Sequence, residues 1–449
     1  MGVADISLSK YGMALAGSAF IEFSGRVSKV VGLTIESDGP EANIGELCEI
    51  KASREGRSVY AEVVGFRDGK ALLMPLGNLN GVGPGSKIIA TGSNLSVAVG
   101  KSLIGRVLDG LGNPIDGGGP VCAEAMYTVD HQAPHPLARK RITEPLPLGV
   151  KAIDSLLTIG KGKRVGIFSG SGVGKSTVMG MIARNTKAGI NVIALIGERG
   201  REVREFLEKD LKKEGLARSV VVVATSDQPA LIRLKGAFVA TAIAEFYRNK
   251  GYDVLLLMDS LTRFAMAQRE IGLAVGEPPV SRGYTPSVFG QMPKLLERAG
   301  CAERGSITGL YTVLVDGDDL TEPVTDTARG ILDGHIVLSR ALANRNQYPA
   351  IDILASISRV MPDVVTPEHR AVAAEIKKVI AVYRDAEDLI NIGAYTRGSN
   401  EKIDYALDVI DNIQAFIEQK VDESFTFEQI LELMGKVLTP PNVARTAST

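Results

Sequence analysis

The sequence lacks the features that would place the chain outside the cell or across a membrane. Its three cysteines, Cys48, Cys122 and Cys301, are a sparse, odd set without metal-type spacing. The residues after Met1 do not show the basic-then-apolar pattern of a signal peptide. The longest apolar runs, such as 220–224, are far too short to cross a bilayer. These absences favour a protein of a reducing, cytoplasmic compartment.

An excess of charge of either sign is also absent, because 51 lysines and arginines face 52 aspartates and glutamates. A dedicated nucleic-acid binder usually carries a basic excess, so we expect no nucleic-acid partner. The remaining composition, 45% hydrophobic and 23% charged, is ordinary for a globular protein. A chain of 449 residues without an internal repeat predicts roughly two to four domains.

The most informative stretch that is present runs from Ser169 to Thr177 and reads SGSGVGKST. It follows the apolar run 164–168 and leads into the helix-like run 178–184. A strand, a glycine-rich turn, Lys-Ser and a helix form the phosphate-binding loop of P-loop NTPases. Ser169 stands where the usual pattern begins with glycine, and a small residue still fits there.

This loop predicts binding of a nucleotide together with Mg²⁺. Lys175 would bring its charge to the β- and γ-phosphates, and the Ser176 hydroxyl would ligate Mg²⁺. The alternative, a glycine-rich hairpin or linker, is disfavoured by the strand before the loop and the helix after it. The residues expected to bind the nucleotide here are Gly170, Ser171, Gly172, Val173, Gly174, Lys175, Ser176 and Thr177.

Three regions follow one another along the chain. Residues 19–91 contain short β-branched runs broken by turn residues, which predicts a small β-barrel or sandwich. In residues 92–361 strands alternate with helices, which predicts an α/β domain with a mostly parallel sheet. Residues 362–449 have a helical pattern and form the third predicted domain. Residues 1–18 fit none of these and are either a frayed terminus or an amphipathic segment.

Two apolar runs of the central region end in carboxylates. Glu198 follows the run 193–197, and Asp259 follows the run 254–258. In a parallel sheet these ends meet at the edge where ligands bind. Phosphoryl transfer to water needs Mg²⁺ and an oriented nucleophile, so Asp259 would hold the Mg²⁺ shell and Glu198 would orient the water. Each carboxylate by itself could instead be a helix N-cap.

Several basic and aromatic residues near these runs are further candidates. Arg199 and Arg263 directly follow the two carboxylate segments and are either phosphate clamps or members of surface ion pairs. Tyr348 precedes a proline, which holds it extended, and Arg359 ends a serine-rich stretch. The residues alone favour a domain-boundary loop for segment 347–359.

Five motifs together resemble the catalytic subunits of the rotary ATPase superfamily, and the resemblance covers about residues 20–435. The motifs are Gly105–Pro114, Gly170–Ser176, Gly197–Val203, Asp259–Arg263 and the signature Pro349–Ser358. Within the superfamily, the runs Gly197–Val203 and Met258–Glu270 are most similar to the type III export ATPases, which power flagellar assembly or virulence injectisomes, and among these to the flagellar group.

The resemblance implies a RecA-like P-loop core, an N-terminal barrel, a C-terminal helical domain and a homohexameric ring that hydrolyses ATP with Mg²⁺. It implies that Glu198 is the catalytic carboxylate and Asp259 the Walker B acid. It further implies that Tyr348 stacks on adenine and that Arg359 is an arginine finger for the neighbouring subunit. Such a finger contributes roughly 10³–10⁵ in rate in other NTPases.

The resemblance also implies partners and a location. The family's regulator, a stator-like protein, grips the N-terminal segment, here residues 1–18. Other implied partners are a central stalk protein, the export gate at the inner membrane, and export substrates with their chaperones. The expected location is therefore cytoplasmic, peripheral at the cytoplasmic face of the inner membrane.

Four alternatives remain. A virulence type III secretion ATPase shares every motif. The catalytic β subunit of an ATP synthase carries an acidic lever motif, and no such acidic run follows Gly393. A Rho-type RNA helicase shares the P-loop but needs neither 105–114 nor 356–359, and the net charge disfavours it. A P-loop scaffold that binds nucleotide without hydrolysis would not need Glu198 or Arg359.

Overall fold

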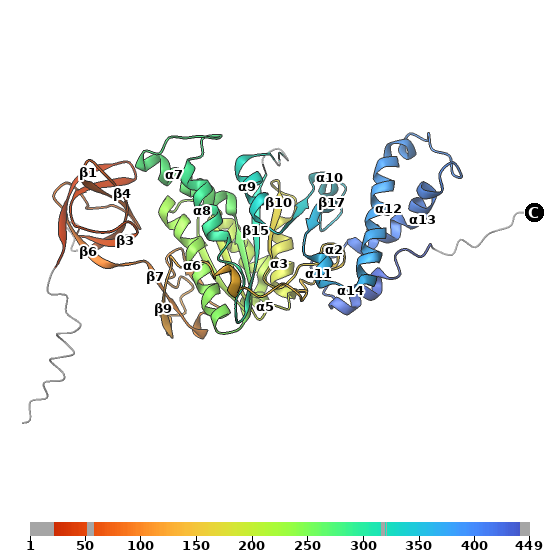
Figure 1. Cartoon of the computed structure of the whole chain (residues 1–449), viewed down its shortest axis with the longest axis horizontal. Helices are drawn as coiled ribbons and strands as arrows, with labels where there is room; N and C mark the ends of the chain where they lie inside the picture. Colours follow the sequence, from red (N-terminus) through yellow and green to blue (C-terminus); the bar gives the residue numbers. More distant parts are fainter. Residues whose placement is uncertain (1–21, 52–57, 316–318, 320, 441–449) are drawn as a thin grey trace, which may run out of the picture. The chain divides into compact units, whose positions relative to one another are not determined.

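The computed structural model describes residues 22–51, 58–315, 319 and 321–440 (Figure 1). The predicted regulator-binding segment, residues 1–18, lies outside the described residues. The chain divides into two compact units that meet between Leu95 and Ser96. The three-domain boundaries after residues 91 and 361 stay a prediction.

The first unit is a closed β-barrel, as the sequence predicts (Figure 1). Along β3, buried residues alternate with more accessible ones, which is the pattern of a strand with one face on a core. Val27, Ile35, Ile50, Val63 and Leu73 form the interior of the barrel. In spatial order its strands are β1 (Ser24–Val31), β2 (Thr34–Asp38), β5 (Lys70–Pro75), β4 (Ser58–Arg67), β3 (Glu46–Lys51) and β6 (Lys87–Asn94).

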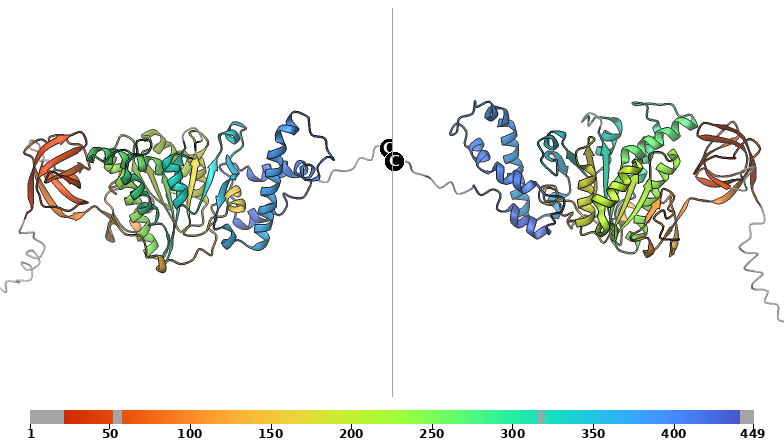
Figure 2. Two further views of the ribbon diagram at one scale, coloured as in Figure 1. Left: turned by 45° about the horizontal axis from the view of Figure 1, so that its top comes forward. Right: turned by 180° about the vertical axis from the view of Figure 1, so that it is seen from behind.

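The second unit is built on a mostly parallel sheet in which nine strands are described. Its main strand order is β17 (Ile351–Ser358), β16 (Gly334–Leu338), β10 (Arg164–Ser169), β15 (Ser306–Leu314), β13 (Asp253–Asp259), β11 (Ile190–Ile196), β12 (Ser219–Ala224) and β8 (Val107–Asp109). The short β14 (Gly300–Cys301) pairs with β15, and β7 (Ser96–Val99) pairs with β9 (Ala125–Thr128) in a separate ribbon. All residues of β11 and β12 are buried, because helices cover both faces of the sheet (Figures 1 and 2).

The helices of the core lie mostly between successive strands of the sheet. They are α2 (Lys151–Leu156), α3 (Lys175–Asn185), α4 (Gly200–Glu205), the π-helical turn η3 (Phe206–Leu211), α5 (Lys212–Leu216), α6 (Ala230–Asn249), α7 (Leu261–Val275), α8 (Pro286–Leu296), α9 (Pro323–Ile331), α10 (Arg340–Asn344) and α11 (Met361–Val364). Short 3₁₀ turns lie at η1 (Lys101–Leu103) and η2 (Pro136–Ala138). Ser260 caps the start of helix α7, because its hydroxyl accepts a hydrogen bond from Arg263 N. Gly276 caps the end with a φ of 95°, a conformation that glycine adopts readily.

The sequence-based interpretation of segment 347–359 as a loop is wrong. Residues Ile351–Ser358 form β17, an edge strand that runs antiparallel to β16. The buried side chains of Ile351 and Ile353 are two apart, as a strand requires, but Pro349 and the serines obscured this short alternation. Strand β8 was likewise not predicted. It lies within the Gly105–Pro114 motif and forms the opposite edge of the sheet, parallel to β12.

The C-terminal region is helical, as predicted, and consists of α12 (Pro367–Asn391), α13 (Glu401–Ile417) and α14 (Phe427–Met434). The Thr366 hydroxyl accepts a hydrogen bond from His369 N and caps α12. Helix α14 begins with a capping box between Thr426 and Gln429. Helices α12 and α13 pack against each other as a hairpin (Figure 1).

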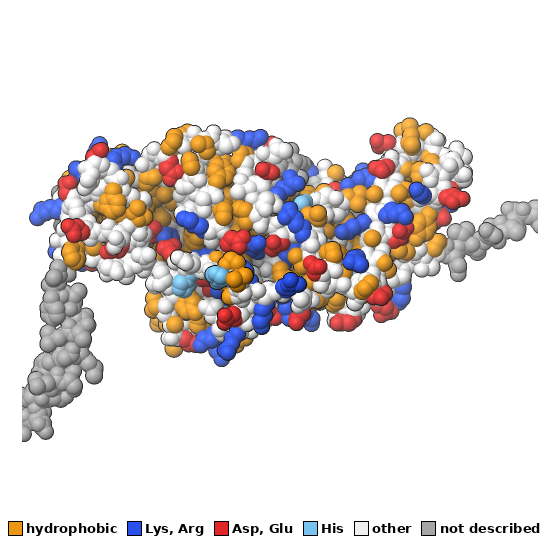
Figure 3. Space-filling model, in the orientation of Figure 1, with side chains coloured by type: hydrophobic (Ala, Val, Ile, Leu, Met, Phe, Trp, Pro, Cys, Tyr) orange, Lys and Arg blue, Asp and Glu red, His pale blue; other side chains and the backbone are white. Residues whose placement is uncertain are grey.

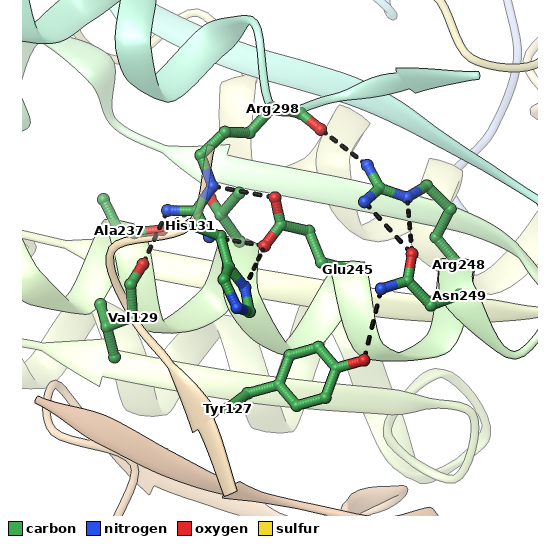
Figure 4. Close-up of polar contacts among 9 residues, drawn as sticks. Tyr127, Val129, His131, Ala237, Glu245, Arg248, Asn249 and Arg298 are labelled. Atoms are coloured by element: carbon green, nitrogen blue, oxygen red, sulfur yellow. Dashed lines mark hydrogen bonds and ion pairs between the residues drawn. The ribbon is translucent and has the colours of Figure 1, made fainter. Parts of the chain in front are cut away.

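A buried ion pair connects α6 to Arg298, which follows α8, and both of its members also contact the segment after β9 (Figure 4). Arg298 donates from Nε and Nη2 to the two carboxylate oxygens of Glu245, at 2.9 and 2.6 Å. The third arm of the guanidinium donates to the carbonyl oxygen of Val129 at 2.8 Å, and His131 Nδ1 lies 3.3 Å from Glu245. These contacts hold residues 129–131 against the core on the way from the ribbon to the P-loop strand.

Basic and acidic side chains are interspersed over the face drawn in Figure 3, in keeping with the balanced composition. Within the residues that the structure describes, every helix is too short or too polar to span a membrane.

Candidate nucleotide site

The phosphate-binding loop occupies the carboxyl end of β10. The strand ends at Ser169, and α3 begins at Lys175. Gly172 and Gly174 have φ angles of 79° and 90°, in the left-handed region that glycine adopts without strain. The loop therefore presents backbone N–H groups and the positive end of an eleven-residue helix to one point, which is a geometry for binding phosphate.

The lysine of this loop contacts both predicted carboxylates. Strands β11 and β13 are parallel neighbours with Leu195 opposite Asp259, so Glu198 and Asp259 emerge at the same edge. Lys175 Nζ donates to Asp259 Oδ1 and lies 3.6 Å from Glu198 Oε1. All three side chains are largely buried. The structure thus brings together the three groups that the sequence assigned to phosphate, water and metal.

Burial and mutual charge perturb the protonation of this cluster. Burial and, next, the negative charge of Asp259 raise the pKa of Glu198 to about 7, against the opposing effect of Lys175. Burial disfavours the charge on Lys175, but Asp259 and Glu198 outweigh it and raise the pKa of the lysine. Clustered groups with perturbed pKa values in a cleft are typical of catalytic sites.

The donor atoms at this edge fit Mg²⁺. Ser176 lies in the first turn of α3 and Asp259 ends β13, which gives a hydroxyl and a carboxylate oxygen, the hard ligands that Mg²⁺ prefers. Proteins usually bind this ion with one or two such groups and complete its shell with phosphate and water. Among the described residues, no group of three or more His, Cys, Asp or Glu could hold a metal ion.

Thr312 is a residue of this site that sequence reasoning missed. Its hydroxyl donates to Asp259 Oδ1 at 2.7 Å from the neighbouring strand β15 and orients that carboxylate. A polar residue in the centre of a buried strand was the sequence signal that could have indicated this role.

A cavity of about 690 Å³ adjoins the loop on the side of the C-terminal helices. Gly174, Thr177 and Tyr348 are among the residues that line it. The ring of Tyr348 packs directly on the loop, because a Cβ added to Gly174 would lie 3.6 Å from two of its ring carbons. The volume suits a small ligand such as a nucleotide, and the half-exposed tyrosine face offers a stacking surface.

Gln419 closes this cavity from the C-terminal region and was not predicted. Its side-chain oxygen accepts from Lys151 N at 2.8 Å, its amide nitrogen donates to Gly149 O at 3.0 Å, and its backbone N donates to Tyr348 O at 3.0 Å. A glutamine after the end of α13 gave no sequence signal, because only the packing of that helix on the core places it here.

The two arginines after the carboxylates occupy different environments. Arg263 packs closely against Gly197, because a Cβ added to that glycine would lie 2.7 Å from the Cβ of Arg263. The buried Nε of Arg263 has no hydrogen-bond partner among the described residues. Arg199 has a side chain that is 80% exposed and pairs with Glu202 at 3.9 Å. Their roles as phosphate clamps stay predictions.

Arg359 lies at the opposite end of the sheet from the phosphate-binding loop. Ser169 is level with Leu338, and Leu338 with Ile351, whereas Ser358 is level with Gly334 at the amino end of β16. Gly334 is four residues, roughly 13 Å, from Leu338 along β16, because β17 carries extra residues between Asp352 and Ile357. The exposed side chain of Arg359 donates from Nη1 to the carbonyl oxygen of Leu332 at 3.4 Å, at the end of β16 away from the loop of its own chain.

Three sequence families match this chain in succession. Residues 27–92 match the β-barrel domain of the ATP synthase alpha/beta family, and residues 149–358 match the nucleotide-binding domain of the same family. Residues 365–436 match the C-terminal domain of the EscN ATPases of type III secretion systems.

The chain is 56% identical to the flagellum-specific ATP synthase of Bacillus subtilis over 90% of its length and 93% of that protein. It is 51% identical to the flagellum-specific ATP synthase of Treponema pallidum over 98% of both chains. The type 3 secretion system ATPase of Xanthomonas euvesicatoria is 51% identical over 92% of this chain and 93% of its own.

A solved structure of the assembled ATPase EscN from the type III secretion system of enteropathogenic E. coli has the same fold. Its TM-score to this chain is 0.86, with 46% identity over 92% of this chain and 100% of that one. A structure of the same ATPase in complex with its central stalk EscO gives the same TM-score, identity and coverage.

Proposed function

This chain belongs to the ATP synthase alpha/beta family, within its group of flagellar and type III secretion ATPases, and from that premise we propose that it is a Mg²⁺-dependent ATPase that energises flagellar type III protein export. The observation that carries the hydrolysis is the contact of Lys175 with both Asp259 and Glu198. A site that only stored nucleotide would not need a second buried carboxylate beside the phosphates.

The side chains divide the reaction among them. Backbone N–H groups of residues 170–175 and the Lys175 ammonium bind the phosphates and neutralise their charge. Ser176 and Asp259 would hold Mg²⁺, which would supply a Lewis acid to the reaction when bound. Glu198 holds and orients the attacking water, and Tyr348 stacks on the adenine ring.

The active form in this proposal is a homohexamer with shared sites. Arg359 contacts Leu332 at the end of β16 away from the loop of its own chain, which supports a role for it in the site of a neighbouring subunit. The assembled EscN supports this arrangement by its fold and identity. The remaining partners in the proposal are a central stalk, a stator-like regulator and the export gate, where the chain is peripheral to the cytoplasmic face of the membrane.

Flagellar export is favoured over virulence secretion by the flagellum-specific relatives, one of which matches 98% of both chains. Expression of the chain in a flagellated strain that lacks its own export ATPase should restore swimming. Restored injectisome secretion without restored swimming would instead support the virulence alternative.

The decisive experiment measures the ATPase rate per chain against protein concentration, with size analysis in parallel. We expect the rate per chain to rise as rings form. Arg359→Ala should reduce it by about 10³-fold or more without loss of nucleotide affinity, whereas Arg397→Ala, which changes an exposed arginine of the helical hairpin, should not. Glu198→Gln should bind ATP and abolish turnover.

Two results would contradict the proposal. A monomer whose rate does not depend on concentration would exclude the shared site. Retained turnover in Glu198→Gln would exclude Glu198 as the group that orients the water.

A further inference from the structure

A fully buried lysine lies at the amino end of β10, far from the phosphate-binding loop. Lys163 immediately precedes the strand, and its side chain has no exposed surface. Its Nζ donates to the hydroxyl of Ser358 at 2.5 Å, the one acceptor that it contacts among the described residues. An ammonium carries three donors, so a buried one with a single neutral partner is poorly satisfied.

This contact reaches the residue next to Arg359. Ser358 ends β17, and its hydroxyl donates onward to the carbonyl oxygen of Thr158 at 2.7 Å. Lys163 and Thr158 therefore fix Ser358 from two sides. Because Ser358 and Arg359 are bonded neighbours, the position of the serine sets the point from which the arginine side chain starts.

The backbone of Arg359 is also supported by Asp333, which is in turn held by Arg164, the residue after Lys163. Arg359 N donates to Asp333 O at 3.3 Å, and the Asp333 carboxylate accepts from Arg164 N at 3.0 Å and from Arg164 Nε at 3.3 Å. Two consecutive residues at the start of β10 thus support Arg359 through two different partners.

Stability does not account for Lys163. Burial lowers the pKa of Lys163 to about 8; the negative charge of Asp333 opposes this shift, and the positive charge of Arg359 adds to it. Placing a cation in a buried position beside a second cation costs free energy, and an apolar residue of the same length would avoid that cost.

We propose that Lys163 is a positioning residue that directs Arg359, through the hydroxyl of Ser358, toward the active site of the neighbouring subunit. The inference rests on the proposed shared site and adds a residue to it. Lys163 touches neither the nucleotide cavity nor the two carboxylates, so its effect is confined to the site of the next subunit.

The kinetic test compares Lys163→Met, Lys163→Gln and Ser358→Ala. Loss of the donor should lower kcat about tenfold or more while KM changes less than about twofold, because a misplaced group far from the chemistry weakens only the transition state. Ser358→Ala should behave likewise, and the double variant should be no slower than either single one. Lys163→Gln keeps a donor and should recover part of the rate. Additive losses, or a kcat unchanged in Lys163→Met, would overturn the inference.

Mixed rings separate this inference from the proposed function. Lys163→Met has an intact site but a misdirected finger, whereas Glu198→Gln has an inactive site but an intact finger. We expect equal mixtures of the two to regain activity, as mixtures of Arg359→Ala with Glu198→Gln should. Mixtures of Lys163→Met with Arg359→Ala should be no faster than Lys163→Met alone.

The outcomes are distinguishable. If Arg359→Ala and Glu198→Gln fail to complement each other, the shared site itself is wrong. If they complement and Lys163→Met with Glu198→Gln does not, then Lys163 supports its own site and the inference fails. Should Lys163→Met not fold, as judged by its thermal transition, the same mixtures with Ser358→Ala decide the question.

Discussion

At the scale of single residues, the site depends on placing one lysine between two carboxylates. Glu198 is buried, lies close to Asp259, and has one oxygen without a hydrogen-bond partner among the described residues. The cluster is therefore arranged for a phosphate chain and a water molecule and is electrostatically strained without them. This strain has a measurable effect on stability.

The nucleotide-free protein should lose stability as Glu198 ionises. Its pKa is raised to about 7 in the folded state, so the folded protein holds this proton more tightly than the unfolded chain does. The free energy of unfolding then falls as pH rises from the ordinary glutamate range to about 7, and the loss is complete above that. Glu198→Gln removes this penalty. The free energy of unfolding of this variant, relative to the wild type, should therefore increase by on the order of 1–3 kcal/mol between about pH 5 and pH 8.

Denaturant unfolding of both proteins at the two pH values tests this expectation. Glu208→Gln, which changes a surface carboxylate of the same connecting segment, is the matched control. A constant difference between Glu198→Gln and the wild type across this range would show that burial does not perturb the glutamate.

At the scale of elements, the two ends of β10 lie at two different functional regions. Its carboxyl end leads into the phosphate-binding loop, and its amino end contacts the groups around Arg359. One strand therefore bears on the chain's own site and on the residue proposed to act in the next one. The segment that leads from β9 toward β10 is held in place by contacts with the buried Glu245–Arg298 pair (Figure 4).

Removing one member of this pair should be costly. Glu245→Gln should lower the free energy of unfolding by about 3–5 kcal/mol, because it leaves the buried Arg298 guanidinium without a counter-charge. The double variant with Arg298→Met should be less destabilised than the sum of the single ones. Lys436→Met, which breaks an exposed pair with Glu432, should cost no more than about 1 kcal/mol. Equal destabilisation of Glu245→Gln and Lys436→Met in denaturant unfolding would contradict this account.

At the scale of the whole molecule, the nucleotide cavity belongs to one unit. Every residue that lines it follows Ser96, and it includes residues of both the sheet domain and the C-terminal helices. Ligand binding should therefore stabilise the sheet domain and the helices together and leave the barrel unaffected.

Calorimetry can resolve this difference. With Mg²⁺ and a non-hydrolysable ATP analogue at about 100 times its Kd, the unit after Leu95 should gain about 2.7 kcal/mol and the barrel nothing. A single thermal transition that shifts as a whole when the ligand binds would show that the two units unfold as one. Tyr348→Ala should weaken the shift by removing the stacking surface.

The sequence by itself determined the local chemistry and most of the elements. The spacing of glycines, lysine and serine in 169–177 defines the loop, and apolar runs ending in Glu198 and Asp259 define two adjacent strand ends, because these signals lie within a few residues of one another. Only the tertiary structure decided that Thr312 and Gln419 belong with these groups and that Lys163 contacts Ser358 beside Arg359. Their partners are distant in the chain, and the contacts arise from strand order and helix packing, which no local pattern encodes.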